Sequence, residues 1–216
     1  MNHQVTFPSK NHFGSPFSVQ VGDCKDPRIA ARVALEYAAA KGITLHSVRI
    51  TDIDTRGGNF SGLKAINCEF RNVLWEQSTL DNAEFNGCQF ESNVFSDTSS
   101  AADAVFLQCD LSRATLAKFN APRTQWAGCN FSYVQAPGFI APAAVFTNCR
   151  TLAANFTGAV LTWADMRSCA NAGEIIAGSA GTADDRAVLE FYNRNACNRV
   201  MADAHANHLS LNLATN

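Results

Sequence analysis

Large apolar residues recur at every fifth position through the middle of the chain. Steps of five from Leu45 to Phe95 and from Phe106 to Met166 cover 24 positions, and 18 of these hold Phe, Leu, Ile, Trp or Met. These five types make up 43 of the 216 residues, so chance would place about 5 of them at 24 positions. The recurrence therefore indicates a repeating structure. One extra residue separates the two series, between Phe95 and Phe106.

A second series of mostly small or branched residues lies two positions before the first, and the residues between are chiefly polar. An α-helix would need apolar residues at intervals of three and four, and a simple strand at intervals of two. A period of five instead predicts a chain that turns a corner every five residues, with two side chains inward and three outward. Six members of the second series are cysteines spaced by 20 or 21 residues: Cys68, Cys88, Cys109, Cys129, Cys149 and Cys169.

Four segments resemble the pentapeptide-repeat motif, which consists of a small residue, Asn or Asp, Leu or Phe, Ser, Thr or Arg, and a variable residue. They are Asn59-Phe60-Ser61-Gly62, Cys129-Asn130-Phe131-Ser132, Ala154-Asn155-Phe156-Thr157-Gly158 and Ala164-Asp165-Met166-Arg167. The resemblance covers about residues 43–169. It implies an all-β solenoid, a right-handed quadrilateral β-helix of about six coils with four pentapeptides per coil. The six cysteines would then form a ladder along one inner side.

The segment before the repeat predicts a capping helix. Asp26 is placed as its N-cap, Pro27 in its first turn and Gly42 at its end. Apolar residues recur along one face, at Ile29, Val33 and Tyr37, with Ala30, Ala34 and Ala38 beside them. Solenoids need caps on their open ends, so we expect residues 1–42 to form an arm and a helix that covers the N-terminal end of the core.

The segment after the repeat, residues 170–216, is expected to be a linker followed by a helix. Residues 170–182 are rich in Gly and Ala, and residues 182–185 resemble a capping box that opens a helix ending near Ala204. Two roles remain open for this helix: dimerisation, as in many pentapeptide-repeat proteins, or a cap on a monomer. Its apolar stripe consists of Val188, Leu189, Tyr192, Ala196 and Val200.

Two stretches interrupt the repeat. Residues 97–103 carry the inserted residue, and prolines follow the inward positions at Ala136-Pro137-Gly138 and Ala141-Pro142. Both stretches predict protruding loops or bulges, because Gly and Pro favour turns.

Composition and chemistry favour binding over catalysis. The net charge is −2 and no apolar stretch is long enough to span a bilayer, so we expect a cytoplasmic protein without membrane contact. The ladder cysteines should be buried and inert, and His205 and His208 supply only half of a metal site. We therefore expect no enzymatic activity, no metal and no cofactor.

Charge is distributed unevenly along the repeat. Residues 69–110 carry a net charge of −7, whereas residues 111–169 carry +4, which predicts a dipolar rod. The acidic residues are the candidate partner-binding site: Glu69, Glu76, Asp81, Glu84, Glu91, Asp97, Asp103 and Asp110.

Some pentapeptide-repeat proteins, such as those that give quinolone resistance, resemble duplex DNA and bind DNA gyrase. B-DNA carries one charge per ~1.7 Å, so two coils (~10 Å) would need about 6 charges and a rod of ~30 Å about 17. The acidic segment reaches this density locally, but the whole repeat carries only a few net negative charges. The resemblance therefore implies a partial DNA mimic that binds a topoisomerase or, in a phage setting, a host defence nuclease. A protein–protein scaffold or effector that binds through loops or end helices is the alternative, a structural spacer is a third, and direct nucleic-acid binding is not expected.

Overall fold

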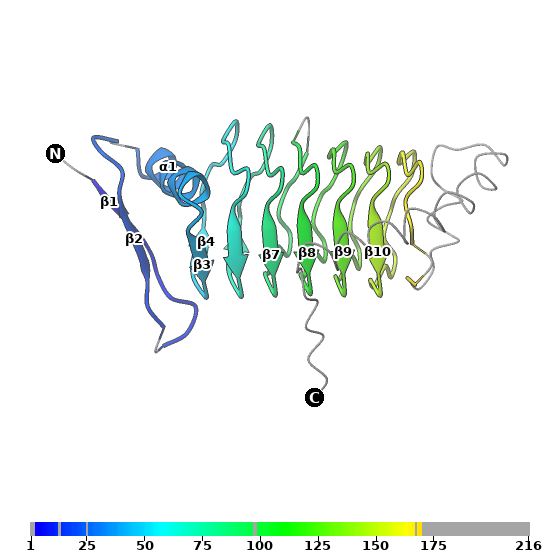
Figure 1. Cartoon of the computed structure of the whole chain (residues 1–216), viewed down its shortest axis with the longest axis horizontal. Coiled ribbons are helices and arrows are strands. Elements are labelled where there is room, and N and C mark those ends of the chain that lie inside the picture. The colour runs from blue at the N-terminus through cyan, green and yellow to red at the C-terminus, as the bar shows by residue number, and fades with distance from the viewer. Residues whose placement is uncertain (1–2, 13, 25, 97–98, 167, 170–216) are drawn as a thin grey trace.

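The computed structural model describes residues 3–12, 14–24, 26–96, 99–166 and 168–169, and it shows a parallel β-solenoid preceded by a hairpin and a helix (Figure 1). Six parallel strands stack in the order β10-β9-β8-β7-β5-β3. Each begins one coil. In coil order they are β3 (Thr44–His46), β5 (Lys64–Ile66), β7 (Glu84–Asn86), β8 (Val105–Leu107), β9 (Gln125–Ala127) and β10 (Val145–Thr147).

These strands form side one of a four-sided coil. On side two, β4 (Arg49–Thr51) pairs in parallel with β6 (Glu69–Arg71). Side three has parallel bridges such as Asp54↔Leu74, and side four has bridges such as Asn59↔Thr79. Partners are 20 residues apart, except across the third coil, where Thr79 pairs with Ser100. The expected quadrilateral β-helix is confirmed, with the inserted residue in the third coil.

Each corner is a turn that suits the five-residue period. At one corner the Phe139 N–H donates to the Ala136 carbonyl at 3.2 Å, and the third turn residue, Gly138, has a φ of 66°. Pro137 precedes it with negative φ, so the turn is type II, which favours Pro at its second position and Gly at its third. The expectation of a protruding loop here was wrong, because the Gly138 N–H still donates to the Thr157 carbonyl of the next coil at 2.9 Å.

The Asn or Asp of the motif stabilises the next corner through its side chain. The Asn130 Oδ1 atom accepts from the Ser132 N–H at 3.1 Å, and the Asp110 Oδ1 atom accepts from the Ser112 N–H at 2.9 Å. These side chains also connect coils, because the Asn130 Nδ2 atom donates to the Asp110 Oδ1 atom at 3.1 Å. Short polar side chains of this kind mimic a backbone turn, which explains why the motif requires them.

Aromatic rings stack along the inside of side one. Phe85 lies 5.0 Å from Phe106, and Phe106 lies 4.0 Å from Trp126, between ring centroids. Trp126 stacks in turn on Phe146 at 6.1 Å, and its indole N–H donates to the Thr124 hydroxyl at 2.8 Å. The five-residue period thus places ring on ring in successive coils, and the buried indole of Trp126 has a hydrogen-bond partner.

The N-terminal helix α1 (Pro27–Ala40) begins where the sequence predicts. The Asp26 side chain accepts from the Arg28 N–H at 2.9 Å, and Gly42 follows the helix with a φ of 63°. Of the apolar residues predicted along the helix, Ala30, Ala34 and Ala38 are buried, whereas Ile29 and Tyr37 are each 43% exposed. The face packed on the coil is built mainly from alanine, whose small side chain lets a helix approach closely. Its residues are Ala30, Ala31, Ala34, Leu35, Ala38 and Ala39.

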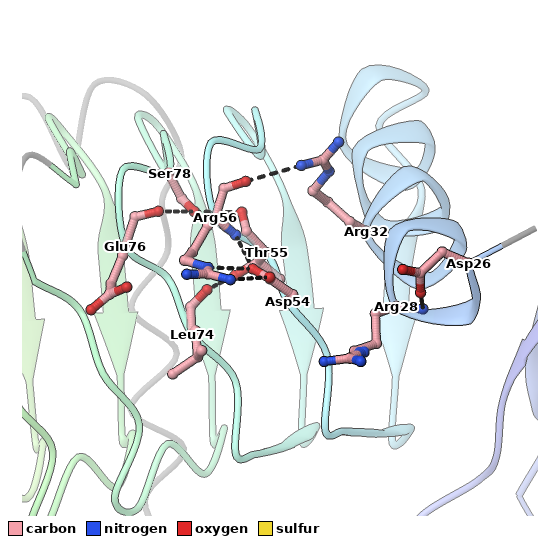
Figure 2. Close-up of polar contacts among 9 residues, drawn as sticks. All are labelled: Asp26, Arg28, Arg32, Asp54, Thr55, Arg56, Leu74, Glu76 and Ser78. Carbon is pink, nitrogen blue, oxygen red and sulfur yellow. Dashed lines mark hydrogen bonds and ion pairs between the residues drawn. The ribbon is translucent and has the colours of Figure 1, made fainter. Parts of the chain in front are cut away.

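Side chains of α1 bind backbone groups at the open edge of the first coil. The Arg32 Nη1 atom donates to the Arg56 carbonyl at 3.0 Å, and the Glu36 carboxylate accepts from the Asn59 N–H at 3.0 Å. Figure 2 shows the Arg32 contact. Unpaired edge groups are a template for association with other chains, and α1 satisfies two of them.

A hairpin that was not predicted from the sequence precedes α1. Strands β1 (Gln4–Phe7) and β2 (Phe17–Gln20) pair antiparallel, and the chain between them bonds to the first coil. The Arg49 N–H donates to the Pro8 carbonyl at 2.8 Å, and the Lys10 N–H donates to the Ser47 carbonyl at 2.6 Å. The arm thus extends the cap over side two. The predicted C-terminal helix lies outside the described residues, together with its stripe of Val188, Leu189, Tyr192, Ala196 and Val200.

Candidate macromolecule-binding surface

The acidic residues that are close in sequence spread around the second to fourth coils. Their positions follow from the repeat register. Asp97 lies outside the described residues. Glu84 lies on side one, Glu69, Glu91 and Asp110 on side two, Glu76 on side three, Asp81 on side four, and Asp103 at the corner between sides four and one. The structure therefore gives a ring of carboxylates rather than one acidic face.

Several of these carboxylates form ion pairs with bases of the neighbouring coil. The Lys64 Nζ atom lies 2.9 Å from a Glu84 carboxylate oxygen. Two nitrogens of Arg123 bind both Asp103 oxygens, at 2.7 and 2.6 Å. In each pair the partners are 20 residues apart, so they lie one coil apart on the same side. The net negative charge at these positions is therefore smaller than the −7 obtained by summing the charges of residues 69–110 along the sequence.

Glu69 is the most enclosed of the seven acidic residues that the structure describes. Its side chain is 9% exposed and lies between two guanidinium groups: the Arg49 Nε atom donates to it at 2.9 Å, and Arg71 forms the other contact. The hydrogen bond from Arg49 lowers the pKa of Glu69. On side three, the hydrogen bond from Arg56 lowers the pKa of Asp54 to about 2 (Figure 2). At pH 7 both carboxylates are ionised, and neighbouring arginine side chains balance their negative charge.

Glu76 and Asp81 have neutral donors instead. The Ser96 hydroxyl donates to the Glu76 Oε1 atom at 3.1 Å. The Ser100 hydroxyl and the Ala102 N–H donate to the Asp81 Oδ1 atom at 2.6 and 2.8 Å. Neutral donors orient a carboxylate without cancelling its charge. Arg56 and Arg123, which are hydrogen-bonded to Asp54 and Asp103, interact with Glu76 and Asp81 only electrostatically. Glu76 lies in the turn that ends side three of the second coil, and Asp81 lies in the next turn, which ends side four. We call these two residues together the acidic corner.

The bases of the second half do not gather on one surface. Arg113, Lys118 and Arg123 occupy three successive corners of the fourth coil, each with positive φ. Arg113 also lies 3.6 Å from Glu91 of the third coil. The expected dipole is thereby reduced, because bases of one half neutralise acids of the other.

An apolar surface on the last two coils was not predicted from the sequence. Tyr133 and Leu152 on side two are 49% and 53% exposed, and Ile140, Val160 and Trp163 on side four are 36%, 37% and 46% exposed. All five occupy outward or corner positions of the repeat. The five-residue period in the sequence already places these residues outside the inward positions, so their exposure could have been predicted.

The cysteine ladder lies inside side two and is confirmed as buried. The Cys109 thiol is 1% exposed and contacts the Phe85 carbonyl of the preceding coil at 3.5 Å. Burial raises the pKa of Cys109 well above its ordinary value, so its thiol stays protonated. In the described part of the chain no three His, Cys, Asp or Glu residues are placed to hold a metal ion, and His205 and His208 lie outside it. No helix in that part has the length and apolar character of a membrane span.

Parallel coils with four five-residue sides define the class of protein: the chain folds as a pentapeptide-repeat β-helix. No protein-family model and no curated protein matches the sequence. Among solved structures, the chain is similar to trypsin-treated QnrB1, a plasmid-mediated fluoroquinolone resistance protein, with 21% identity, a TM-score of 0.47, and coverage of 58% of this chain and 72% of that chain.

Two further solved structures are pentapeptide repeat proteins. One, from the Arabidopsis thaliana thylakoid lumen, has 22% identity, a TM-score of 0.40, and coverage of 53% of this chain and 68% of that chain. The other is HetL, involved in heterocyst differentiation regulation in the cyanobacterium Nostoc sp. strain PCC 7120. It has 16% identity, a TM-score of 0.29, and coverage of 59% and 65%. At these identities the likeness concerns the fold alone.

Proposed function

We propose that the chain is a non-catalytic binding protein that presents its acidic corner to the basic surface of a protein partner. The observation that carries this proposal is the fixed geometry of Glu76 and Asp81. Both are held from the third coil, by Ser96 and by Ser100 with Ala102. A preorganised surface loses little conformational freedom on binding, which favours affinity.

The partner class follows from the sign and extent of the charge. Proteins that handle DNA carry basic surfaces that match phosphate spacing, and the acidic corner offers two carboxylates of suitable sign. The cross-coil ion pairs restrict any DNA mimicry to this corner. The proposed partner is therefore a topoisomerase or a host defence nuclease, engaged over a short stretch rather than along the whole rod.

The test compares two charge reversals of equal size. Full-length wild type, the Glu76→Lys/Asp81→Lys variant and the control Glu84→Lys/Glu91→Lys are used to capture proteins from host lysate, and the partner is then purified. We expect the first variant to lose most of the binding. The control should bind within a few-fold of wild type, because its carboxylates are already paired with Lys64 and Arg113.

Binding through the acidic corner should also weaken as salt rises, because exposed charges are screened beyond ~8 Å at physiological ionic strength. Circular dichroism would check that each variant is folded. Equal binding by both variants, or binding indifferent to salt, would refute the acidic corner as the site.

A scaffold that binds through its end helix is the second candidate. It is favoured by the exposure of Ile29 and Tyr37, each 43%, on the outer face of α1. An Ile29→Glu/Tyr37→Glu variant tests it. Loss of the captured partner in this variant, with retention in the charge-reversed one, would assign the binding to α1.

A further inference from the structure

Side four changes from polar to apolar along the rod. In the first two coils its outward positions hold Asn59, Thr79 and Asp81. In the last two coils they hold Ile140, Pro142, Val160 and Thr162, and Trp163 occupies the corner. Ile140 and Val160 are bridge partners in adjacent coils and are 36% and 37% exposed, and Trp163 is 46% exposed. We call Ile140, Pro142, Val160 and Trp163 the apolar strip.

Toward the middle of the rod the apolar strip continues into a surface whose charged residues, Asp103, Lys118 and Arg123, lie at its corners. The bridge ladder of side four runs from Val160 through Ile140 and Asn120 to Ser100. Three intervals at the ~4.8 Å spacing of strands make about 14 Å. Over this length the outward positions of side four, apart from the corner residues, carry no charge, because Ala102 and Pro122 flank the ladder. The surface suits an apolar segment that runs along the rod.

The chain itself supplies a segment of matching length. The apolar stripe from Val188 to Val200 covers 12 residue steps, and as a helix it would be about 18 Å long at 1.5 Å per residue. The described coil ends at Cys169 on side two, half a turn from side four. The 13 residues 170–182 could span at most ~43 Å when fully extended, which is enough to reach side four.

We propose that residues 183–204 dock on side four of the same molecule, with the stripe from Val188 to Val200 against Ile140, Val160 and Trp163. A short linker gives the tail an effective concentration in the millimolar range. That advantage favours the tail of the same chain over a second copy. The docked segment removes an exposed apolar surface from water, which is the dominant driving force for such contacts.

Cross-linking through the native Cys197 tests this placement in the full-length chain. Cys197 adjoins Ala196 of the stripe, and Val160→Cys supplies a thiol on side four. Cys24 is replaced by Ser in every variant, because it is the half-buried thiol that would compete. Under mild oxidation we expect a 160–197 disulfide within one chain, seen as a faster-migrating monomer and located by mass spectrometry.

Leu152→Cys is the matched control, since Leu152 is 53% exposed but lies on side two. Its cross-linking to Cys197 should be at least ten-fold slower. Disulfide-linked dimers of the Val160→Cys variant would overturn the proposal in favour of a second copy. Equal rates for the two thiols would overturn it in favour of an undirected tail.

Hydrogen exchange gives an independent measurement. We expect the amides of residues 185–201 to be protected in wild type, and the protection to fall at least ten-fold in Ile140→Glu/Val160→Glu but not in Leu152→Glu. The replaced side chains point outward, so the thermal midpoint of the coils should stay unchanged. Unprotected amides in wild type, or equal protection in both variants, would refute the docking.

Discussion

Phe106→Ala should be among the most destabilising single substitutions in the coil. Phe106 is fully buried and stacks between Phe85 at 5.0 Å and Trp126 at 4.0 Å. Truncating a buried Phe costs about 3–5 kcal/mol, and each lost aromatic pair contributes about 0.5–1.5 kcal/mol beyond area burial. Because two stacked neighbours are lost, we expect a value in the upper half of that range, about 4–5 kcal/mol.

The assay is urea unfolding of the full-length chain, followed by circular dichroism and by tryptophan fluorescence. Leu107→Ala is the matched control, because Leu107 is the next residue of β8 and points outward. Its cost should stay below about 1 kcal/mol, as for surface positions. If the midpoints of the two variants shift equally, the inward and outward assignment of β8 is wrong. The five-residue register would then fail with it.

Three further predictions concern charge, corners and thiols. Glu69→Gln should lower stability at pH 7 by about 1–3 kcal/mol, since it removes charged hydrogen bonds. Because the folded pKa of Glu69 is lowered, this difference should be full above the unfolded pKa of about 4.3 and be lost as the pH falls through the folded pKa; an unchanged difference at pH 2 in denaturant titrations would contradict it. At corners, Ala143→Gly should stabilise by about 0.5–1 kcal/mol, because alanine with positive φ is strained, whereas Gly138→Ala should destabilise by a similar amount; the same sign in both melts would contradict the turn assignment. A thiol reagent should label Cys24 in the native protein and the ladder cysteines, such as Cys109, only after unfolding.

The sequence was sufficient to predict the β-helix, because its two interlocked series report directly which side chains point inward. Phe85, Phe106 and Trp126 stack as the period requires. The hairpin of β1 and β2 was not predictable in the same way. Its strands are four residues each, and its contacts with the first coil join residues about 40 positions apart. No local pattern reports such a contact.

The exposure of Ile29 and Tyr37 was not predictable for a related reason. Apolar periodicity identified both these large side chains and the alanines beside them, but only the alanines pack on the end of the coil. The choice between two apolar faces of a helix depends on the shape of the surface that it meets. That shape belongs to the first coil and is absent from the helix sequence.

The candidate site was only partly predictable from the sequence. The acidic residues were identified, but their charge was summed along the chain, where Glu84 and Asp103 have few bases close by. In space their neighbours are Lys64 and Arg123, each 20 residues away. Charge in a solenoid must be summed along a side, over residues that share a register.

The same 20-residue spacing limits how proteins of this shape change length. Removal of one complete coil would leave every later side chain on its original side, whereas removal of five residues would turn all later sides by a quarter of the circumference. A five-residue deletion would thus move Arg123 away from Asp103 and every later ring away from its stacking partner. The 21-residue third coil shows the other tolerated change, a single residue absorbed between Phe95 and Ala101 without loss of register beyond it. Natural length variation should therefore occur in whole turns, or as small insertions confined to corners.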